Sequence, residues 1–134
     1  MKIEDVEGIG PAYAAKLDAA GVKTTDALLE QGAKASGRKA LEEATGISAA
    51  KLLEWVNHAD LMRIKGVGSE YSDLLEAAGV DSPAELARRN AANLATTFAE
   101  LDAARPNMVR RVPSEKEIQG WIDQSKDLPK VVEH

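Results

Sequence analysis

Two glycine-containing segments, Gly8-Ile9-Gly10 and Gly66-Val67-Gly68, are where the backbone of this chain is best suited to bind a ligand. Each stands directly before a run of helix-forming residues. Glycine lets a backbone approach a ligand closely. The first amide N–H groups of the following helix have no acceptor within that helix, and the helix dipole favours a negative charge beside them. The chemistry indicated is the binding of a phosphate or another anion.

The side chains next to these two segments carry little positive charge. Ala12 follows the first glycine pair and Glu70 follows the second, while Glu7 precedes the first pair and Lys65 the second. A carboxylate in the first turn of a helix stabilises that helix but repels a phosphate. The glycines are therefore equally consistent with a structural role, in which they permit two helices to pack at a tight angle.

Arginines are concentrated in the second half of the chain, where residues 103–114 include no acidic residue. The guanidinium group is suited to planar contacts with phosphate or carboxylate. A solvated protein face is the alternative interpretation of such a group, and Lys34, Arg38 and Lys39 form a comparable stretch earlier in the chain. The arginines concerned are Arg88, Arg89, Arg105, Arg110 and Arg111.

The residue types needed for catalysis are scarce. The chain has no cysteine and two histidines, which is too few for a convincing zinc site, and the carboxylate spacing fits no metal loop. No nucleophile is paired with a base, and Gly8-Ile9-Gly10 lacks the Lys-Ser/Thr ending of a nucleotide-binding loop. We therefore predict a protein that is not an enzyme, with no metal, no catalytic residue and no small-molecule substrate.

The composition predicts an all-α protein. Ala and Leu supply most of the 44% hydrophobic fraction, and no strand-like alternation of β-branched residues is present. A net charge of −5 argues against strong nucleic-acid binding, because phosphate neutralisation drives that association. No signal peptide or long apolar run is present, which predicts a cytoplasmic protein without a membrane partner.

A repeat organises the whole chain. Residues 6–22 and 64–80 align with eight identities in seventeen positions, 58 residues apart. A second match, Leu52-Leu53-Glu54-Trp55-Val56 with Ile118-Gln119-Gly120-Trp121-Ile122, lies 66 residues apart, so the second copy holds about eight extra residues around 103–113. One structural unit used twice is expected. The predicted domains are 1–62, 63–130 and a tail, 131–134, that is consistent with the start of an expression tag.

About nine or ten short helices are expected, and local signals predict how several of them begin and end. Pro11 begins a helix and Gly21 ends it in a left-handed conformation, as Gly79 does in the second copy. Thr25 and Ser48 are expected N-caps, and Ser114 with Glu117 forms a capping box. Trp55 and Trp121 are expected to be buried. His58 aligns with Gln124, which favours hydrogen bonding over proton transfer.

These motifs resemble those of the helix-hairpin-helix superfamily: Gly-hydrophobic-Gly, then a helix closed by Ala-Ala-Gly-Val. Over nearly the whole chain the pattern is similar to a bacterial tandem helix-hairpin-helix family labelled as a domain of unknown function. The resemblance implies two repeats packed with pseudo-twofold symmetry and contacts to DNA phosphates that do not read sequence. We expect no cofactor, although the resemblance allows a monovalent cation at a hairpin turn. It also implies a basic residue at the positions held here by Ala12 and Glu70.

We therefore expect a non-catalytic module that binds DNA weakly and without sequence preference. The alternative is a protein–protein interaction adaptor that keeps the fold without binding DNA. Ala12, Glu70 and the acidic net charge favour the adaptor, whereas the glycine pairs and the arginines favour DNA. The candidate nucleic-acid-binding residues are Gly8, Ile9, Gly10, Ala12, Lys65, Gly66, Val67, Gly68, Ser69, Arg88, Arg89, Arg105, Arg110 and Arg111.

Overall fold

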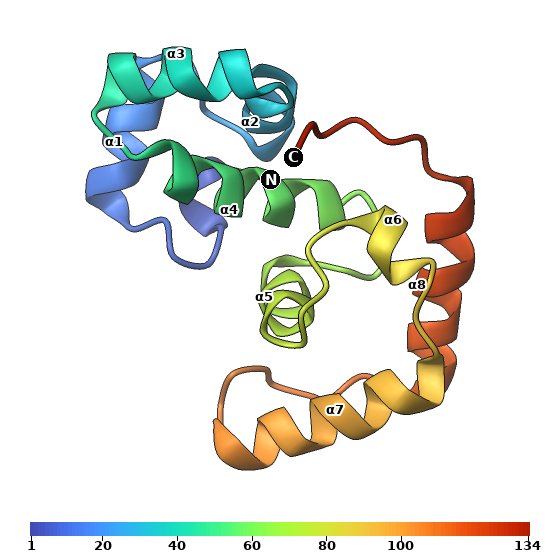
Figure 1. The fold of residues 1–134 in the computed structure, drawn as a ribbon. Helices are drawn as coiled ribbons and strands as arrows, with labels where there is room; N and C mark the ends of the chain where they lie inside the picture. Colours follow the sequence, from blue (N-terminus) through green and yellow to red (C-terminus); the bar gives the residue numbers. More distant parts are fainter. The chain divides into compact units, whose positions relative to one another are not determined.

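The computed structural model describes residues 1–134 and is entirely helical (Figure 1). It contains eight α-helices and one 3-10 helix, which confirms the all-α class and lies at the lower end of the expected number of helices. The one β-type pairing is an isolated bridge between Lys2 and Thr24. No helix has the length and apolar character needed to cross a membrane.

The chain forms two compact units. Unit 1 comprises Met1–Asp60 together with Val131–His134, and unit 2 comprises Leu61–Lys130. The helices from the N-terminus through the end of unit 1 are η1 (Ile3–Asp5), α1 (Pro11–Ala19), α2 (Thr25–Gly32), α3 (Ala35–Thr45) and α4 (Ala49–Leu61). Unit 2 holds α5 (Ser69–Ala77), α6 (Pro83–Leu86), α7 (Ala91–Ala104) and α8 (Glu115–Asp127).

The ends of α1 and α5 follow the same local rule. Gly21 has φ +86° and Gly79 has φ +88°, so both occupy the left-handed region that glycine adopts at low cost. The N–H of the next residue then turns back onto the helix, from Val22 to the Leu17 carbonyl at 2.8 Å and from Val80 to the Leu75 carbonyl at 2.9 Å. The predicted glycine stops are confirmed.

Most predicted helix starts are also present. Ser114 and Glu117 form the expected capping box at α8, and the Ser48 hydroxyl accepts from the Lys51 N–H at 3.2 Å at the start of α4. The prediction for α2 was wrong by one residue. Thr24, not Thr25, accepts the capping hydrogen bond, because Thr24 has the extended backbone that a cap requires and Thr25 is already helical and buried.

Each unit has a core built around one tryptophan. Trp55 is 2% exposed and Trp121 is 4% exposed, which confirms that both are buried. In unit 2, α8 packs on α6 and α7, and Trp121 belongs to a cluster with Leu75 and Phe98. In unit 1, η1 packs on α1 and α2 packs on α3.

Residues 131–134, which the sequence suggested are a tail, pack into unit 1. Val132 is buried, and the Glu133 N–H donates to the Ala33 carbonyl at 2.7 Å. The buried Arg38 side chain donates to the Glu133 carbonyl at 2.6 Å and to the Gly32 carbonyl at 2.8 Å. The segment therefore satisfies groups at the end of α2 and is part of the packed structure.

Candidate nucleic-acid interface

In turn 1, Gly8-Ile9-Gly10, the two glycines are exposed and the Ile9 side chain between them is buried in the core. Gly8 has φ +87° and Ile9 is only 3% exposed. Gly10 is the extended N-cap of α1, and the first backbone bond of the helix runs from the Ala14 N–H to the Gly10 carbonyl at 2.9 Å. Gly10 has no side chain to cap α1, so the N–H groups at its start face outward without an acceptor in the helix.

Turn 2, Gly66-Val67-Gly68, has the same backbone plan in unit 2. Gly66 has φ +96°, Val67 is buried, and the Ser72 N–H donates to the Gly68 carbonyl at 2.9 Å. The residue before the turn is held by Gln124 of α8, whose side-chain amide accepts from the Lys65 N–H at 2.9 Å and donates to the Lys65 carbonyl at 3.1 Å.

A tryptophan lies beneath the first glycine of each turn, a feature that the sequence analysis did not predict. A Cβ placed on Gly8 would lie 3.6 Å from Trp55 Nε1, and one placed on Gly66 would lie 3.0 Å from Trp121 Nε1. These first glycines are therefore needed for their positive φ, and Gly66 also for space. The available signal was the recurrence of a Trp in each copy of the repeat.

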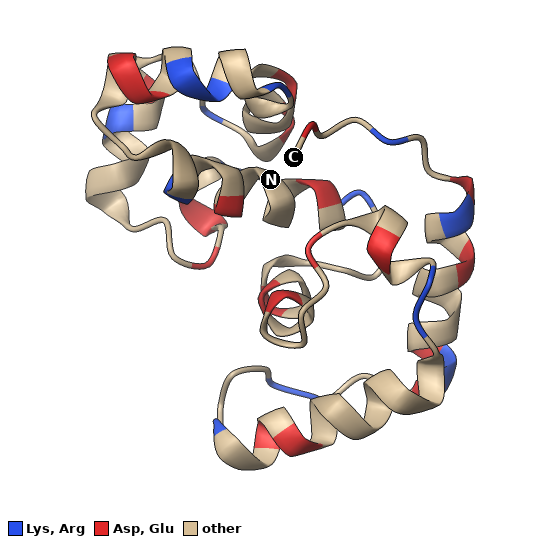
Figure 2. Cartoon of the chain, in the orientation of Figure 1, with Lys and Arg blue, Asp and Glu red and all other residues tan.

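Three of the five candidate arginines of unit 2 form ion pairs with carboxylates. The guanidinium group of Arg111 bonds both oxygens of Glu117, at 2.6 and 2.9 Å. Arg110 Nε lies 3.3 Å from a Glu70 oxygen, and Arg89 pairs with Glu85 at 3.0 Å. Among the helices of this unit, α8 carries both basic and acidic residues, whereas α5, α6 and α7 carry acidic residues alone (Figure 2).

The Arg111–Glu117 pair also shifts proton affinities. The hydrogen bond from Arg111 lowers the pKa of Glu117 to about 2, with a further contribution from the Ser114 N–H, and it raises the pKa of Arg111 above its ordinary value. Both groups stay charged across the neutral range. The pair fixes the loop that precedes α8, where Tyr71 donates to the Arg111 carbonyl at 2.8 Å.

The remaining two candidate arginines, Arg88 and Arg105, are exposed and form no ion pair. They lie on different segments, Arg88 after α6 and Arg105 after α7. The structure thus does not gather the five arginines into one uncompensated basic surface. The sequence could not show this, because Glu70 is forty residues from Arg110 along the chain.

Two lysines that the sequence analysis overlooked lie over an aromatic residue close to turn 1. Lys51 Nζ is 5.1 Å from the centre of the Tyr13 ring and 5.9 Å from that of Trp55, and Lys16 Nζ is 6.0 Å from that of Tyr13. Neither lysine forms an ion pair within the chain. Tyr13 and Trp55 pack edge to face with ring centres 5.1 Å apart.

Lys51 occupies the position that Glu117 has in unit 2, 66 residues later. Tyr71 and Trp121 form the corresponding aromatic pair, with ring centres 5.2 Å apart. An unpaired lysine therefore lies over the first aromatic pair, whereas the aligned residue of unit 2 is a carboxylate paired with Arg111. The alignment of the two copies already pairs Lys51 with Glu117. It does not show that Lys51, on α4, lies over the Tyr13 ring of α1.

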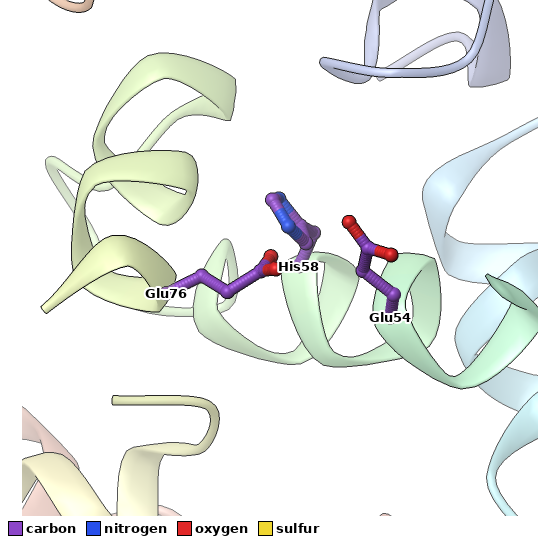
Figure 3. A group of neighbouring side chains, drawn as sticks. All are labelled: Glu54, His58 and Glu76. Atoms are coloured by element: carbon purple, nitrogen blue, oxygen red, sulfur yellow. The ribbon is translucent and has the colours of Figure 1, made fainter. Parts of the chain in front are cut away.

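Glu54 and His58 project from successive turns of α4 (Figure 3). His58 is 2% exposed, and the neighbouring Asn57 Oδ1 lies 3.0 Å from His134 Nε2. Asn57 and His58 thus form a buried polar region of α4 in unit 1, whereas Glu54 is exposed. A hydrogen-bonding role for His58 stays a prediction.

A surface groove of about 540 Å³ lies on unit 1, between η1 and α1. Its lining combines apolar side chains with charged side chains of both signs. The groove is a second surface suited to a ligand, and its lining includes Ile3, Pro11, Ala14, Lys2, Asp18 and Lys23.

The fold and the turns define an all-α protein with two glycine turns that each begin a helix. A family model described as "Domain of unknown function (DUF4332)" matches residues 7–128. The chain therefore belongs to this family. No curated protein and no solved structure matches the chain significantly.

Proposed function

We propose that this protein is a non-catalytic module of two helix-hairpin-helix repeats that binds nucleic acid weakly and without sequence preference. One observation carries the proposal. Turn 1 combines exposed glycines, an uncapped helix start and two unpaired lysines in one small region of unit 1. Phosphate groups are the ligands that such a combination of backbone donors and point charges favours.

Two observations support turn 1, in preference to the arginines of unit 2, as the proposed contact. The first turn of α1 contains no acidic residue, whereas that of α5 contains Glu70. Lys51 is positioned by Tyr13 and Trp55, so less conformational entropy is lost when it contacts a phosphate. The unpaired arginines of unit 2, Arg88 and Arg105, are not part of the proposed contact.

Binding of this kind uses few phosphate contacts. The net charge of the protein, −5, also repels the phosphates. The expected dissociation constant is therefore on the order of 10⁻⁴–10⁻⁶ M at physiological salt, the range of non-specific binding. A monovalent cation at a turn carbonyl, implied by the helix-hairpin-helix resemblance, would add to the attraction.

The alternative function is a protein-interaction adaptor. The ion pairs of Arg89, Arg110 and Arg111 favour it, since paired arginines resemble a stabilised protein surface more than a phosphate clamp. The groove of about 540 Å³ beside α1 offers a surface for such a partner.

Binding titrations with duplex and single-stranded DNA at two salt concentrations test the proposal. The Lys16→Ala/Lys51→Ala variant is expected to bind more weakly and with a shallower salt dependence. Lys39→Ala, which removes an exposed lysine from α3, is the matched control and is expected to bind as the wild type does. Absence of wild-type binding at low salt would overturn the proposal in favour of the adaptor.

A further inference from the structure

The indole nitrogen of Trp55 has an unusual position for a buried donor. The side chain is 2% exposed, yet its Nε1–H forms no hydrogen bond within the chain. Every fully enclosed side-chain nitrogen or oxygen does have a partner. The small exposed part of Trp55 must therefore include this nitrogen.

The exposed nitrogen lies at turn 1. It is 3.6 Å from the position that a Cβ on Gly8 would occupy, and Gly8 is itself exposed. A side chain at position 8 would cover the nitrogen. The absence of one leaves the indole N–H accessible beside the turn that begins α1.

We infer that the Trp55 indole N–H donates to an anionic oxygen of a phosphate or phosphodiester held at turn 1. The inference rests on the proposed function, and it adds a side-chain donor to the backbone amides. The indole N–H is a donor only, and buried tryptophans usually have an acceptor for it. An anionic oxygen at the turn supplies that acceptor. Lys51, over the rings of Tyr13 and Trp55, supplies the opposite charge.

Unit 2 contains the same donor in an unfavourable setting. Trp121 Nε1 lies beneath Gly66, but Glu117 replaces Lys51 and Glu70 stands in the first turn of α5. Arg110 and Arg111 pair with these two carboxylates, so turn 2 has no counterpart of the unpaired Lys51 that lies beside turn 1. The inference therefore assigns anion binding to Trp55 and not to Trp121.

The two tryptophans make this assignment directly measurable, because the chain has only two indole N–H groups. A ¹H–¹⁵N spectrum resolves one indole signal for each. Titration with inorganic phosphate, and separately with an eight-nucleotide oligothymidylate, is carried out at constant ionic strength. The Trp55 signal is expected to shift with both ligands, and the Trp121 signal is expected to stay in place.

The variant Trp55→Phe keeps an aromatic ring and removes the N–H. It is expected to bind the oligonucleotide roughly tenfold more weakly, because a hydrogen bond to a charged group is lost. Trp121→Phe is the matched control and is expected to bind as the wild type does.

The outcomes separate the inference from the proposed function. If the Ala12 and Tyr13 amides shift while the Trp55 indole does not, turn 1 binds anions and the role of Trp55 is overturned. Equal oligonucleotide affinity of folded Trp55→Phe and wild type overturns it as well. If no signal of turn 1 shifts and no binding is measured, the proposed function fails too. If Trp55→Phe does not fold, the shift of the Trp55 indole signal in the wild-type titration still tests the role of Trp55.

Discussion

Turn 1 and turn 2 have the same backbone plan and differently charged side chains beside them. Both place a glycine with positive φ over a tryptophan nitrogen, bury the middle residue and begin a nine-residue helix. Beside the first lie the unpaired Lys16 and Lys51, and beside the second lie Glu70 and Glu117, each paired with an arginine. The comparison teaches that the fold requires the glycines and tryptophans, whereas the charges beside them are set independently.

The largest expected effect tests the structural half of this comparison. Trp55→Ala and Trp121→Ala are each expected to lower the free energy of unfolding by about 3–5 kcal/mol, because each leaves a large cavity in a core. Chemical denaturation followed by circular dichroism measures both. A cost below about 1 kcal/mol for one of them would show that the two tryptophans do not have equivalent roles.

Alanine at the first glycine of each turn sharpens the comparison further. Gly8→Ala and Gly66→Ala are each expected to cost roughly 1–2 kcal/mol, since an L-residue is strained at positive φ. Gly66→Ala should cost more, because its Cβ would lie 3.0 Å from Trp121 Nε1 against 3.6 Å in unit 1.

The second glycines, Gly10 and Gly68, are the controls. Both have negative φ, and a Cβ at either would meet nothing within 4 Å. Alanine at these positions should cost less than at Gly8 and Gly66, at most about 1 kcal/mol, because it is only a poorer N-cap than glycine. A larger loss at Gly10 than at Gly8 would contradict the account of the turns.

Charge exchange at the helix starts tests the electrostatic half. Ala12→Lys and Glu70→Lys are expected to raise the affinity for DNA severalfold, and each is expected to steepen the dependence of log K on log salt by up to about one unit. Arg110→Ala/Arg111→Ala should have a smaller effect, because both side chains already pair with carboxylates. Fluorescence anisotropy at about 50 and about 200 mM salt gives the slope of log K against log salt for each variant. If Arg110→Ala/Arg111→Ala lowers the affinity for DNA more than Lys16→Ala/Lys51→Ala does, the interface lies on unit 2.

The smallest expected effect is a pH dependence of stability confined to unit 2. The pKa of Glu117 is about 2 in the folded protein and 4.5 ordinarily, so its ionised form is favoured by folding. Its contribution is complete above pH of about 5 and is lost as the pH falls towards 2. Solvent screens this exposed pair, so the change is small. Melting temperatures between pH 6 and about 2 should fall less steeply for Glu117→Gln than for the wild type. Parallel curves would contradict the assignment.

Local features of the fold were predictable from the sequence because they depend on neighbouring residues. Gly21 and Gly79 end their helices, and Ser114 caps α8, through bonds that span a few residues. The burial of Trp55 and Trp121 followed from their position in matching helices. The error at Thr24 and Thr25 arose because either of two adjacent threonines has the chemistry of a cap.

The charges of the candidate interface were not predictable in the same way. Arg110 meets a carboxylate forty residues away, and Lys51 meets a ring thirty-eight residues away. Such pairs depend on how the helices of a unit pack, which composition and spacing do not specify. The packing of Val132 and Glu133 into unit 1 was likewise invisible in a segment without a periodic pattern.

The return of residues 131–134 to unit 1 has a consequence for the order in which the chain is made. A ribosome releases the first sixty residues long before the segment that receives hydrogen bonds from Arg38 and Ala35. Domains generally fold as they emerge, N-terminal part first. Here the unit that is synthesised first is the one that is completed last, and its final contacts wait until all of unit 2 has left the ribosome.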